Sequence, residues 1–221
     1  MTVENLPLFP LPLVLFPGTA MPLHIFEPRY RAMLADCLRG DKRFGIVRLP
    51  EGVAEIEIAP GTVGCIAEIL DTDALPDGRS NIVVRGVERF ALDAFVPSTH
   101  EYHVCRAAVF DDEFEIGNEL DALAARVRDV FQRVGRAART LSDDPEPLPE
   151  LPDDSGSLSF AIAAMIDIDL DTRQALLASR SPLERLRRLD ALLSAALGSI
   201  VTRAQVHTVA KTNGRGSHAQ P

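Results

Sequence analysis

Lysine chemistry is limited in this chain, because Lys42 and Lys211 are its only lysines. A phosphate-binding loop needs a Gly-Lys pair, so that backbone amides cradle the phosphates while the lysine reaches them. Lys42 follows Asp41 and Lys211 follows Ala210, so neither position fits. A serine nucleophile that relies on lysine needs a fixed base beside it, and nothing in the sequence orders a serine near either lysine. The sequence therefore gives no basis for ATP hydrolysis or for peptide-bond cleavage.

Two groups of side chains could hold a metal ion, but neither has a suitable pattern. His100, His103 and Cys105 are close together, yet zinc needs three or four fixed ligands, and the helical two-histidine motif has a different spacing. The acidic run 167–171 is similar to the start of a calcium-binding loop. The sixth position of such a loop must be glycine, and this chain has Thr172 there. We therefore expect neither a metal nor another cofactor.

Glu27, Arg29 and Tyr30 could form an acid–base group, because a carboxylate lies near an arginine and a phenol. No nucleophile or second base accompanies them, which a catalytic site would need. Glu27 also directly precedes a predicted helix, where the helix dipole favours its negative charge, and Tyr30 begins the apolar face of that helix. These residues indicate a structural role, so the chain is predicted not to be an enzyme.

The composition is that of a soluble globular protein with a real core, since 46% of the 221 residues are hydrophobic and 25% are charged. The net charge of −9 offers no basic surface for nucleic acid. No apolar run reaches the roughly 18 residues needed to span a bilayer. Cys37, Cys65 and Cys105 form no closely spaced pair. That scatter argues against a disulfide framework and indicates a reducing compartment, the cytoplasm.

Short segments rich in Ile, Val and Phe predict strands through the first half of the chain. The segments are 20–26, 43–49, 62–71, 80–85, 88–96 and 103–110. One helix interrupts them, since Pro28 suits a first helical turn and Gly40 suits a helix end. Several short strands with a single helix predict a small, partly closed β-barrel.

A proline-rich stretch opens the segment 6–49 and precedes most of these strands. Its apolar residues are interrupted by Pro7, Pro10, Pro12 and Pro17. Proline removes a backbone donor and fixes φ, so the stretch cannot be a helix or a central strand. It is also too apolar for a solvated linker. We expect it to lie extended over the core and to pair only at a sheet edge.

The pattern becomes helical after Phe110. Apolar residues at helical spacing predict one long helix and three shorter ones. The long helix covers 118–139, and the shorter ones cover 158–166, 172–179 and the segment from Pro182. The expected caps of the shorter helices are Ser157, Asp171 and Ser181, in that order. Between the first two helices, 142–154 contains four prolines and six acidic residues, which is typical of a solvated loop.

Together these patterns predict an α+β protein with an N-terminal, partly closed β-barrel that contains one helix, followed by a helical bundle. The expected boundaries are 1–112 for the barrel, 113–200 for the bundle and 201–221 for a disordered tail.

Several motifs resemble the N-terminal, substrate-binding domain of the Lon protease family. They are LFPL at 8–11, LFPG at 15–18, PLHIFEPRY at 22–30 and FGIV at 44–47. The resemblance continues to about residue 197, through 63–69, 87–90, 158–164 and 174–177. It implies a PUA-like barrel followed by a helical bundle, in a free-standing form without the ATPase and protease domains. It also implies recognition of unfolded or tagged protein substrates.

We predict a non-catalytic module that binds unfolded or extended polypeptide segments or a partner protein, as an adaptor in protein quality control. Apolar residues of the proline-rich stretch, Leu13, Leu15 and Phe16, are the expected peptide-binding contacts. One alternative is RNA binding, by analogy with PUA-like barrels, although fold alone does not fix function and the net charge opposes it. A second alternative is a small-molecule pocket between barrel and bundle. We expect no nucleic acid and no membrane among the partners.

Overall fold

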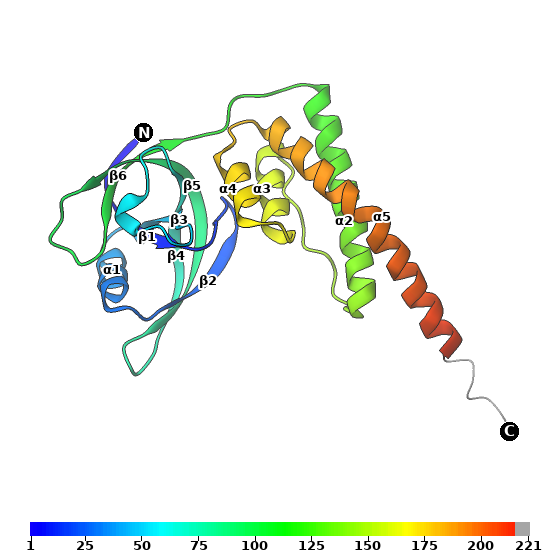
Figure 1. The fold of residues 1–221 in the computed structure, drawn as a ribbon, viewed down its shortest axis with the longest axis horizontal. Helices are drawn as coiled ribbons and strands as arrows, with labels where there is room; N and C mark the ends of the chain where they lie inside the picture. Colours follow the sequence, from blue (N-terminus) through cyan, green and yellow to red (C-terminus); the bar gives the residue numbers. More distant parts are fainter. Residues whose placement is uncertain (215–221) are drawn as a thin grey trace. The chain divides into compact units, whose positions relative to one another are not determined.

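The computed structural model describes the backbone of residues 1–214 and the side chains of residues 1–207. The chain forms two compact units, each built from two separate stretches (Figure 1). The sheet unit comprises Met1–Glu113 and Ala163–Arg180, and the helical unit comprises Phe114–Ile162 and the chain from Ser181 onward. The expected bundle over 113–200 is therefore interrupted, because its segment 163–180 belongs to the sheet unit.

Six strands of the described chain form one mixed sheet, in the order β2-β5-β4-β3-β1-β6. Their bounds are Thr2–Leu11 for β1, Ala20–Ile25 for β2, Arg43–Arg48 for β3, Val63–Ala74 for β4, Ser80–Val96 for β5 and Val104–Phe110 for β6. Strand β5 is long enough to pair with β2 and then with β6, so the sheet curls into a partly closed ring with β2 outside it (Figure 1). This confirms the predicted α+β fold, although the ring is not a clean barrel.

Strand β1 is central, which corrects the expectation that the proline-rich stretch pairs only at an edge. Its first half pairs with β6 as far as Pro7, and its second half pairs with β3 from Leu8. The Leu8 N–H donates toward β6, to the His103 carbonyl, at 2.8 Å. By alternation, the nitrogen of Pro7 faces β3 and that of Pro10 faces β6. Each proline nitrogen thus faces the side on which its half of β1 has no partner, so no ladder hydrogen bond is lost.

Helix α1, Pro28–Arg39, forms where the sequence predicts it. Pro28 occupies the first turn, and the Gly40 N–H closes the helix on the Asp36 carbonyl at 3.1 Å. Tyr30 and Met33 lie on its buried face and pack into the main core of the sheet unit. The helix therefore holds Tyr30 in a fixed position against the ring of strands.

Helix α4, Leu170–Ala178, is attached to the sheet by the buried side chain of Arg89 from β5, which is 3% exposed. Arg89 Nη1 donates to the Leu177 carbonyl at 3.0 Å and to the Ser179 carbonyl at 2.6 Å. Its Nη2 donates to Asp112 Oδ1 at 2.5 Å. A guanidinium at the end of a helix satisfies carbonyls that have no partner within the helix. This contact explains why the segment 163–180 belongs to the sheet unit.

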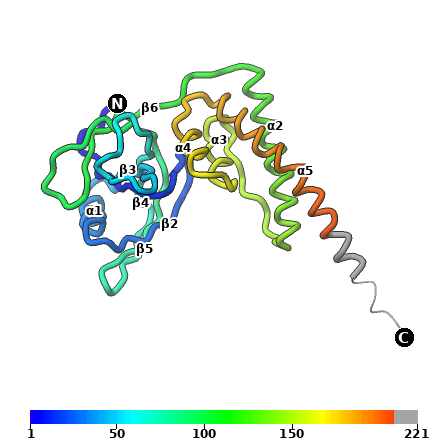
Figure 2. The backbone as a smooth tube through the Cα atoms, viewed as in Figure 1, coloured from blue at the N-terminus to red at the C-terminus, as the bar shows by residue number. Residues whose placement is uncertain are grey.

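The helical unit contains α2, Asn118–Ser142, side by side with α5, Pro182–Gly214 (Figure 2). Helix α3, Ser155–Met165, contains the boundary between the two units. Arg185 of α5 has no exposed surface, and its Nε donates to Ser159 Oγ at 2.8 Å. Within the described residues, every helix is too short or too polar to cross a membrane.

Of the three predicted helix caps, Ser181 is confirmed, because its hydroxyl accepts a hydrogen bond from the first turn of α5 at 3.0 Å. The cap of α4 is Asp169 and not Asp171. Helix α3 also begins earlier than predicted, and Asp154 takes the place expected for Ser157. Aspartate caps a helix as well as serine does. Because Asp154 and Asp169 act as caps, α3 and α4 each begin a few residues before the predicted start.

The proline-rich acidic segment after α2 is mostly exposed, as predicted, but it is also tied to that helix. Arg128 of α2 donates to the Leu151 carbonyl at 3.2 Å and to the Pro152 carbonyl at 2.5 Å. The predicted loop therefore follows α2 instead of extending freely into solvent.

The expected disordered tail, 201–221, begins inside α5, which continues to Gly214. The helix continues because Ala204 is buried and the His207 imidazole lies 3.3 Å from an Asp143 carboxylate oxygen. Two such positions are too few to form an apolar pattern that would predict a helix from the sequence. The remainder of the expected tail, 215–221, lies outside the described residues.

Replacing Arg89 with methionine should destabilise the sheet unit strongly. The change keeps much of the side-chain volume but leaves two carbonyls and the Asp112 carboxylate without their buried donor. We expect a loss of about 3–5 kcal/mol in the free energy of unfolding, measured by urea denaturation. Arg106→Met is the matched control, because Arg106 pairs with Asp93 at the surface, and its midpoint should stay nearly unchanged. An Arg89 variant as stable as this control would contradict the assigned role.

Candidate functional site

The three residues predicted to contact a peptide differ in how deeply they are buried. Leu15 and Phe16 are each 1% exposed and lie in the interior of the sheet unit. Leu13 is only partly buried and packs against the same core. Each large apolar side chain gains roughly 1.5–3 kcal/mol on burial, so the apolar side chains of this stretch turn inward. The expectation is therefore corrected for Leu15 and Phe16, which cannot reach a ligand in the folded protein.

A cavity of about 360 Å³ opens in the sheet unit beside this stretch. Residues 9–12 at the end of β1 form one wall, and residues 24–27 at the end of β2 form another. Tyr30, Leu49 and Glu55 complete the lining. Aromatic rings, prolines and aliphatic side chains make up most of it, with a few polar groups among them. Such a mixture is typical of a ligand pocket, and the volume is at the small end of the range for one.

Glu55 organises the polar side of the cavity. Its carboxylate accepts two hydrogen bonds from the Arg29 guanidinium, both at 2.8 Å, and one from the Tyr30 hydroxyl at 3.0 Å. His103 Nε2 lies 3.2 Å from the same carboxylate. Burial, followed by the charge of Glu55, raises the pKa of Tyr30, so the phenol stays protonated and donates. Glu55 begins a single-turn 3-10 helix, Glu55–Glu57, which is too short to show a periodicity, and its partners are far away in the chain, so the sequence does not single it out.

The second carboxylate at the cavity, Glu27, accepts one hydrogen bond from Arg29 Nε at 3.0 Å. Its side chain is 41% exposed, against 16% for Glu55. It makes no side-chain cap to α1. The arrangement of Glu27, Arg29 and Tyr30 is thus an ion-pair network with Glu55, which supports the structural interpretation over the acid–base one.

Phe26 is the prominent exposed apolar group at the cavity. Its side chain lines the cavity and the residue is 58% exposed. Its ring is stacked with the His24 imidazole at a centroid distance of 6.0 Å, and His24 Nδ1 lies 2.8 Å from Asn81 Oδ1. The imidazole therefore supports the ring from one side and leaves much of its surface open to a ligand.

Strand β2 leads into the cavity and pairs with one neighbour, β5. The Gly86 N–H donates to the Thr19 carbonyl at 3.0 Å, which fixes the alternation along the antiparallel pair. The backbone groups of Ala20, Pro22 and His24 consequently point away from β5. Because Pro22 has no N–H, the row of outward-pointing N–H groups on this edge is broken, while the carbonyls remain. A broken row of donors limits pairing with strands of other chains.

The possible metal ligands noted in the sequence have separate partners. His103 contacts Glu55, whereas the His100 ring stacks on Tyr102 at 4.6 Å. In the acidic run, Asp169 caps α4 and Asp171 pairs with Arg48 at 2.6 Å. Among the residues described, no three potential metal ligands lie close enough together to hold an ion.

The three cysteines are buried and free. Burial raises the pKa of each thiol, Cys37, Cys65 and Cys105, to about 12. Since the thiolate is the reactive form, these side chains are poor nucleophiles at neutral pH.

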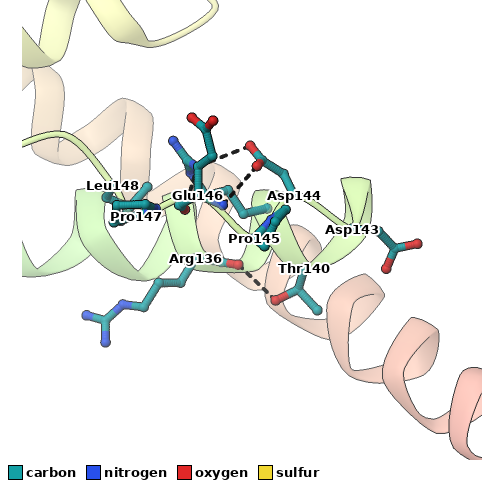
Figure 3. A pocket seen from close by; sticks show the side chains of 9 residues that line it. Arg136, Thr140, Asp143, Asp144, Pro145, Glu146, Pro147 and Leu148 are labelled. Carbon is teal, nitrogen blue, oxygen red and sulfur yellow. Dashed lines mark hydrogen bonds and ion pairs between the residues drawn. The ribbon is translucent and has the colours of Figure 1, made fainter.

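A larger and more open cavity, of about 660 Å³, lies in the helical unit between the end of α2 and the segment 143–148 (Figure 3). Arg139 Nη1 donates to the Glu146 carbonyl at 2.5 Å and pairs with Asp144 at 3.1 Å. The Arg136 side chain points away from the segment (Figure 3). Arg136, Arg139 and Thr140 donate to nearby backbone carbonyls. The polar groups here do not converge on an enclosed point, so we assign no site to this cavity.

The family model described as the ATP-dependent protease La (LON) substrate-binding domain matches residues 5–195. This chain belongs to the Lon substrate-binding domain family. The match confirms the resemblance noted in the sequence motifs and extends it over most of the chain.

Curated relatives of the chain are Lon proteases. Lon protease 2 from Herpetosiphon aurantiacus is 29% identical over 198 residues, which cover 87% of this chain and 24% of the relative. Lon protease from Solibacter usitatus is 26% identical over 196 residues, covering 86% of this chain and 24% of the relative. The chain spans about a quarter of the length of the curated relatives that it matches.

Two solved structures share the fold. The Lon N-terminal domain protein from Xanthomonas campestris is 26% identical, with a TM-score of 0.61 over 86% of this chain and 98% of that one. The N-terminal domain of Mycobacterium avium complex Lon protease is 21% identical, with a TM-score of 0.66 and the same coverage. The similarity to the second structure concerns the fold alone.

Replacing Phe16 and Phe26 with aspartate should separate an interior position from a surface one. Phe16→Asp places a charge in the core and should cost more than about 4 kcal/mol, enough to unfold the sheet unit. Phe26→Asp should change the free energy of unfolding by less than about 1 kcal/mol. Circular dichroism with urea titration measures both variants. A folded Phe16 variant or an unfolded Phe26 variant would contradict the burial described above.

Proposed function

We propose that this chain is a non-catalytic domain that binds extended or unfolded polypeptide segments, as a recognition module or adaptor in protein quality control. The observation that carries the proposal is the apolar cavity at the end of the open-edged strand β2, with Phe26 exposed beside it. The description of the family as substrate-binding supports this role. We propose that the bound segments belong to proteins destined for proteolysis, because the relatives are Lon proteases.

Binding would combine two contacts. An apolar side chain of the ligand enters the cavity and covers the exposed part of the Phe26 ring, a gain of roughly 1–2 kcal/mol. The ligand backbone lies along β2 and uses the carbonyls that point away from β5. Because Pro22 interrupts the donors, edge pairing alone would be weak. Affinity would therefore depend on the side chain in the cavity, which favours unfolded chains with exposed apolar residues.

RNA binding has less support from the sheet unit, because most of its arginines are neutralised locally. Those that pair with carboxylates include Arg29, Arg39, Arg43, Arg48, Arg79, Arg85, Arg89 and Arg106. A phosphate backbone needs basic groups that are free to replace counterions. The buried free thiols fit a reducing compartment, so we propose that the domain works in the cytoplasm.

Because the proposed contacts are mainly apolar, binding of a reduced, unfolded test protein should persist at about 0.5 M salt, where surface electrostatics are largely screened. Phe26→Ala should weaken the binding about fivefold to tenfold, since it removes the apolar contact without disturbing the core. Fluorescence anisotropy of the labelled test protein measures both effects.

Leu70→Ala is the matched control, because Leu70 is 50% exposed and lies outside the lining of the cavity. It should leave the affinity unchanged. The proposal fails if the folded chain binds no unfolded protein, or if Leu70→Ala weakens binding as much as Phe26→Ala does. Salt-sensitive binding of single-stranded RNA in place of polypeptide would support the alternative function.

A further inference from the structure

We infer that the cavity of the sheet unit selects segments in which an aromatic or aliphatic residue lies within two positions of a lysine or arginine, and that Glu27 receives the cationic group. The inference rests on the proposed function and specifies its substrate class. It depends on the different states of the two carboxylates at the cavity.

Glu55 is occupied by groups of the protein itself. Its two oxygens accept three hydrogen bonds from Arg29 and Tyr30, and His103 Nε2 lies 3.2 Å from one of them. A carboxylate has about four lone-pair positions, so Glu55 has little remaining capacity to accept hydrogen bonds. It serves to position Arg29 and Tyr30 in the wall of the cavity.

Glu27 has capacity to spare. Among the described residues, its carboxylate accepts a single side-chain hydrogen bond, from Arg29 Nε at 3.0 Å. With 41% of its side chain exposed, the remaining lone pairs are accessible to a ligand. An ammonium or guanidinium group is the partner that pairs best with such an acceptor.

The charges around the cavity favour a cation. Glu27 and Glu55 contribute two negative charges and Arg29 contributes one positive charge, so these three groups together carry one net negative charge. Arg29 makes a two-bond contact with Glu55 and a single contact with one oxygen of Glu27, so the other Glu27 oxygen accepts no hydrogen bond from Arg29. Apolar walls lower the local dielectric and strengthen the attraction for a cation. An acidic residue next to the apolar one would be repelled.

The ligand must be an internal extended segment with this pattern, because strand β2 runs directly into the two recognising residues. Phe26 and Glu27 are adjacent in the chain and both line the cavity. A segment paired along β2 would therefore bring its apolar and basic side chains to them from neighbouring positions. A free N-terminal amine could supply a cation too, so the test peptides carry a blocked N-terminus.

The test uses the full chain and three labelled peptides of equal length, each acetylated at the N-terminus and amidated at the C-terminus. All carry the same apolar centre, flanked by lysine, glutamine or glutamate. We expect the order lysine, glutamine, glutamate, with about threefold to fivefold between neighbours at about 20 mM salt and a smaller spread at about 500 mM. Glu27→Gln keeps the hydrogen bond to Arg29 but removes the charge, so the three affinities should converge near that of the glutamine peptide.

Glu101→Gln is the control, because Glu101 is exposed, lies outside the cavity lining and changes the net charge by the same amount. It should keep the ranking of the wild type. If the glutamine peptide binds but wild type shows no ranking, or if Glu27→Gln keeps it, the selectivity is refuted while polypeptide binding stands. If no peptide and no unfolded protein binds, the proposed function itself fails.

Discussion

The sheet unit depends on one buried cation, the guanidinium of Arg89. A charge in the interior is costly unless its donors are satisfied, and here two carbonyls at the end of α4 and the Asp112 carboxylate satisfy them. Because these acceptors come from segments far apart in the chain, the need to satisfy one arginine draws α4 back onto the sheet. Gln174 of α4 adds a hydrogen bond from its Nε2 to the Val63 carbonyl at 2.9 Å. The unit therefore closes around a polar contact as much as around its apolar core.

Arginine has the same role in the helical unit. Arg185 is fully buried, with its guanidinium 4.0 Å above the Phe160 ring and its Nε on Ser159. Arg128 ties the proline-rich segment to α2 through two carbonyls. The planar, always charged guanidinium can bind several acceptors and stack on a ring at once, which the point charge of lysine cannot do. This chemistry explains how a chain with two lysines can still use cations as internal connectors.

Local patterns predicted much of the fold, and contacts between distant residues account for most of what was missed. The strand segments, helix α1 with Pro28 and Gly40, and the Ser181 cap depend on neighbouring residues, so the sequence contains the necessary signal. Strand β1 was misjudged because the side that each proline nitrogen faces depends on which neighbour pairs with which half of the strand. The buried role of Arg89 and the position of Glu55 also depend on distant partners. Leu15 and Phe16 were expected at the surface because an apolar run among prolines looks the same whether it covers a core or faces a ligand.

The cavity is lined and supported by residue types that an acid–base site would also use. Glu27, Arg29 and Tyr30 have the chemistry of acid–base catalysis, but Glu55 uses the donors of Arg29 and Tyr30 to fix their positions. The raised pKa of Tyr30 keeps its proton in place, so the phenol is a fixed donor and not a proton shuttle. What remains accessible is an aromatic ring and one carboxylate, on adjacent residues beside a strand edge that Pro22 interrupts. In the proposed function, these groups would recognise a chain by its side chains, and the interrupted edge would limit how tightly it is held. Weak, side-chain-based binding fits the proposed function, in which each bound polypeptide is released again.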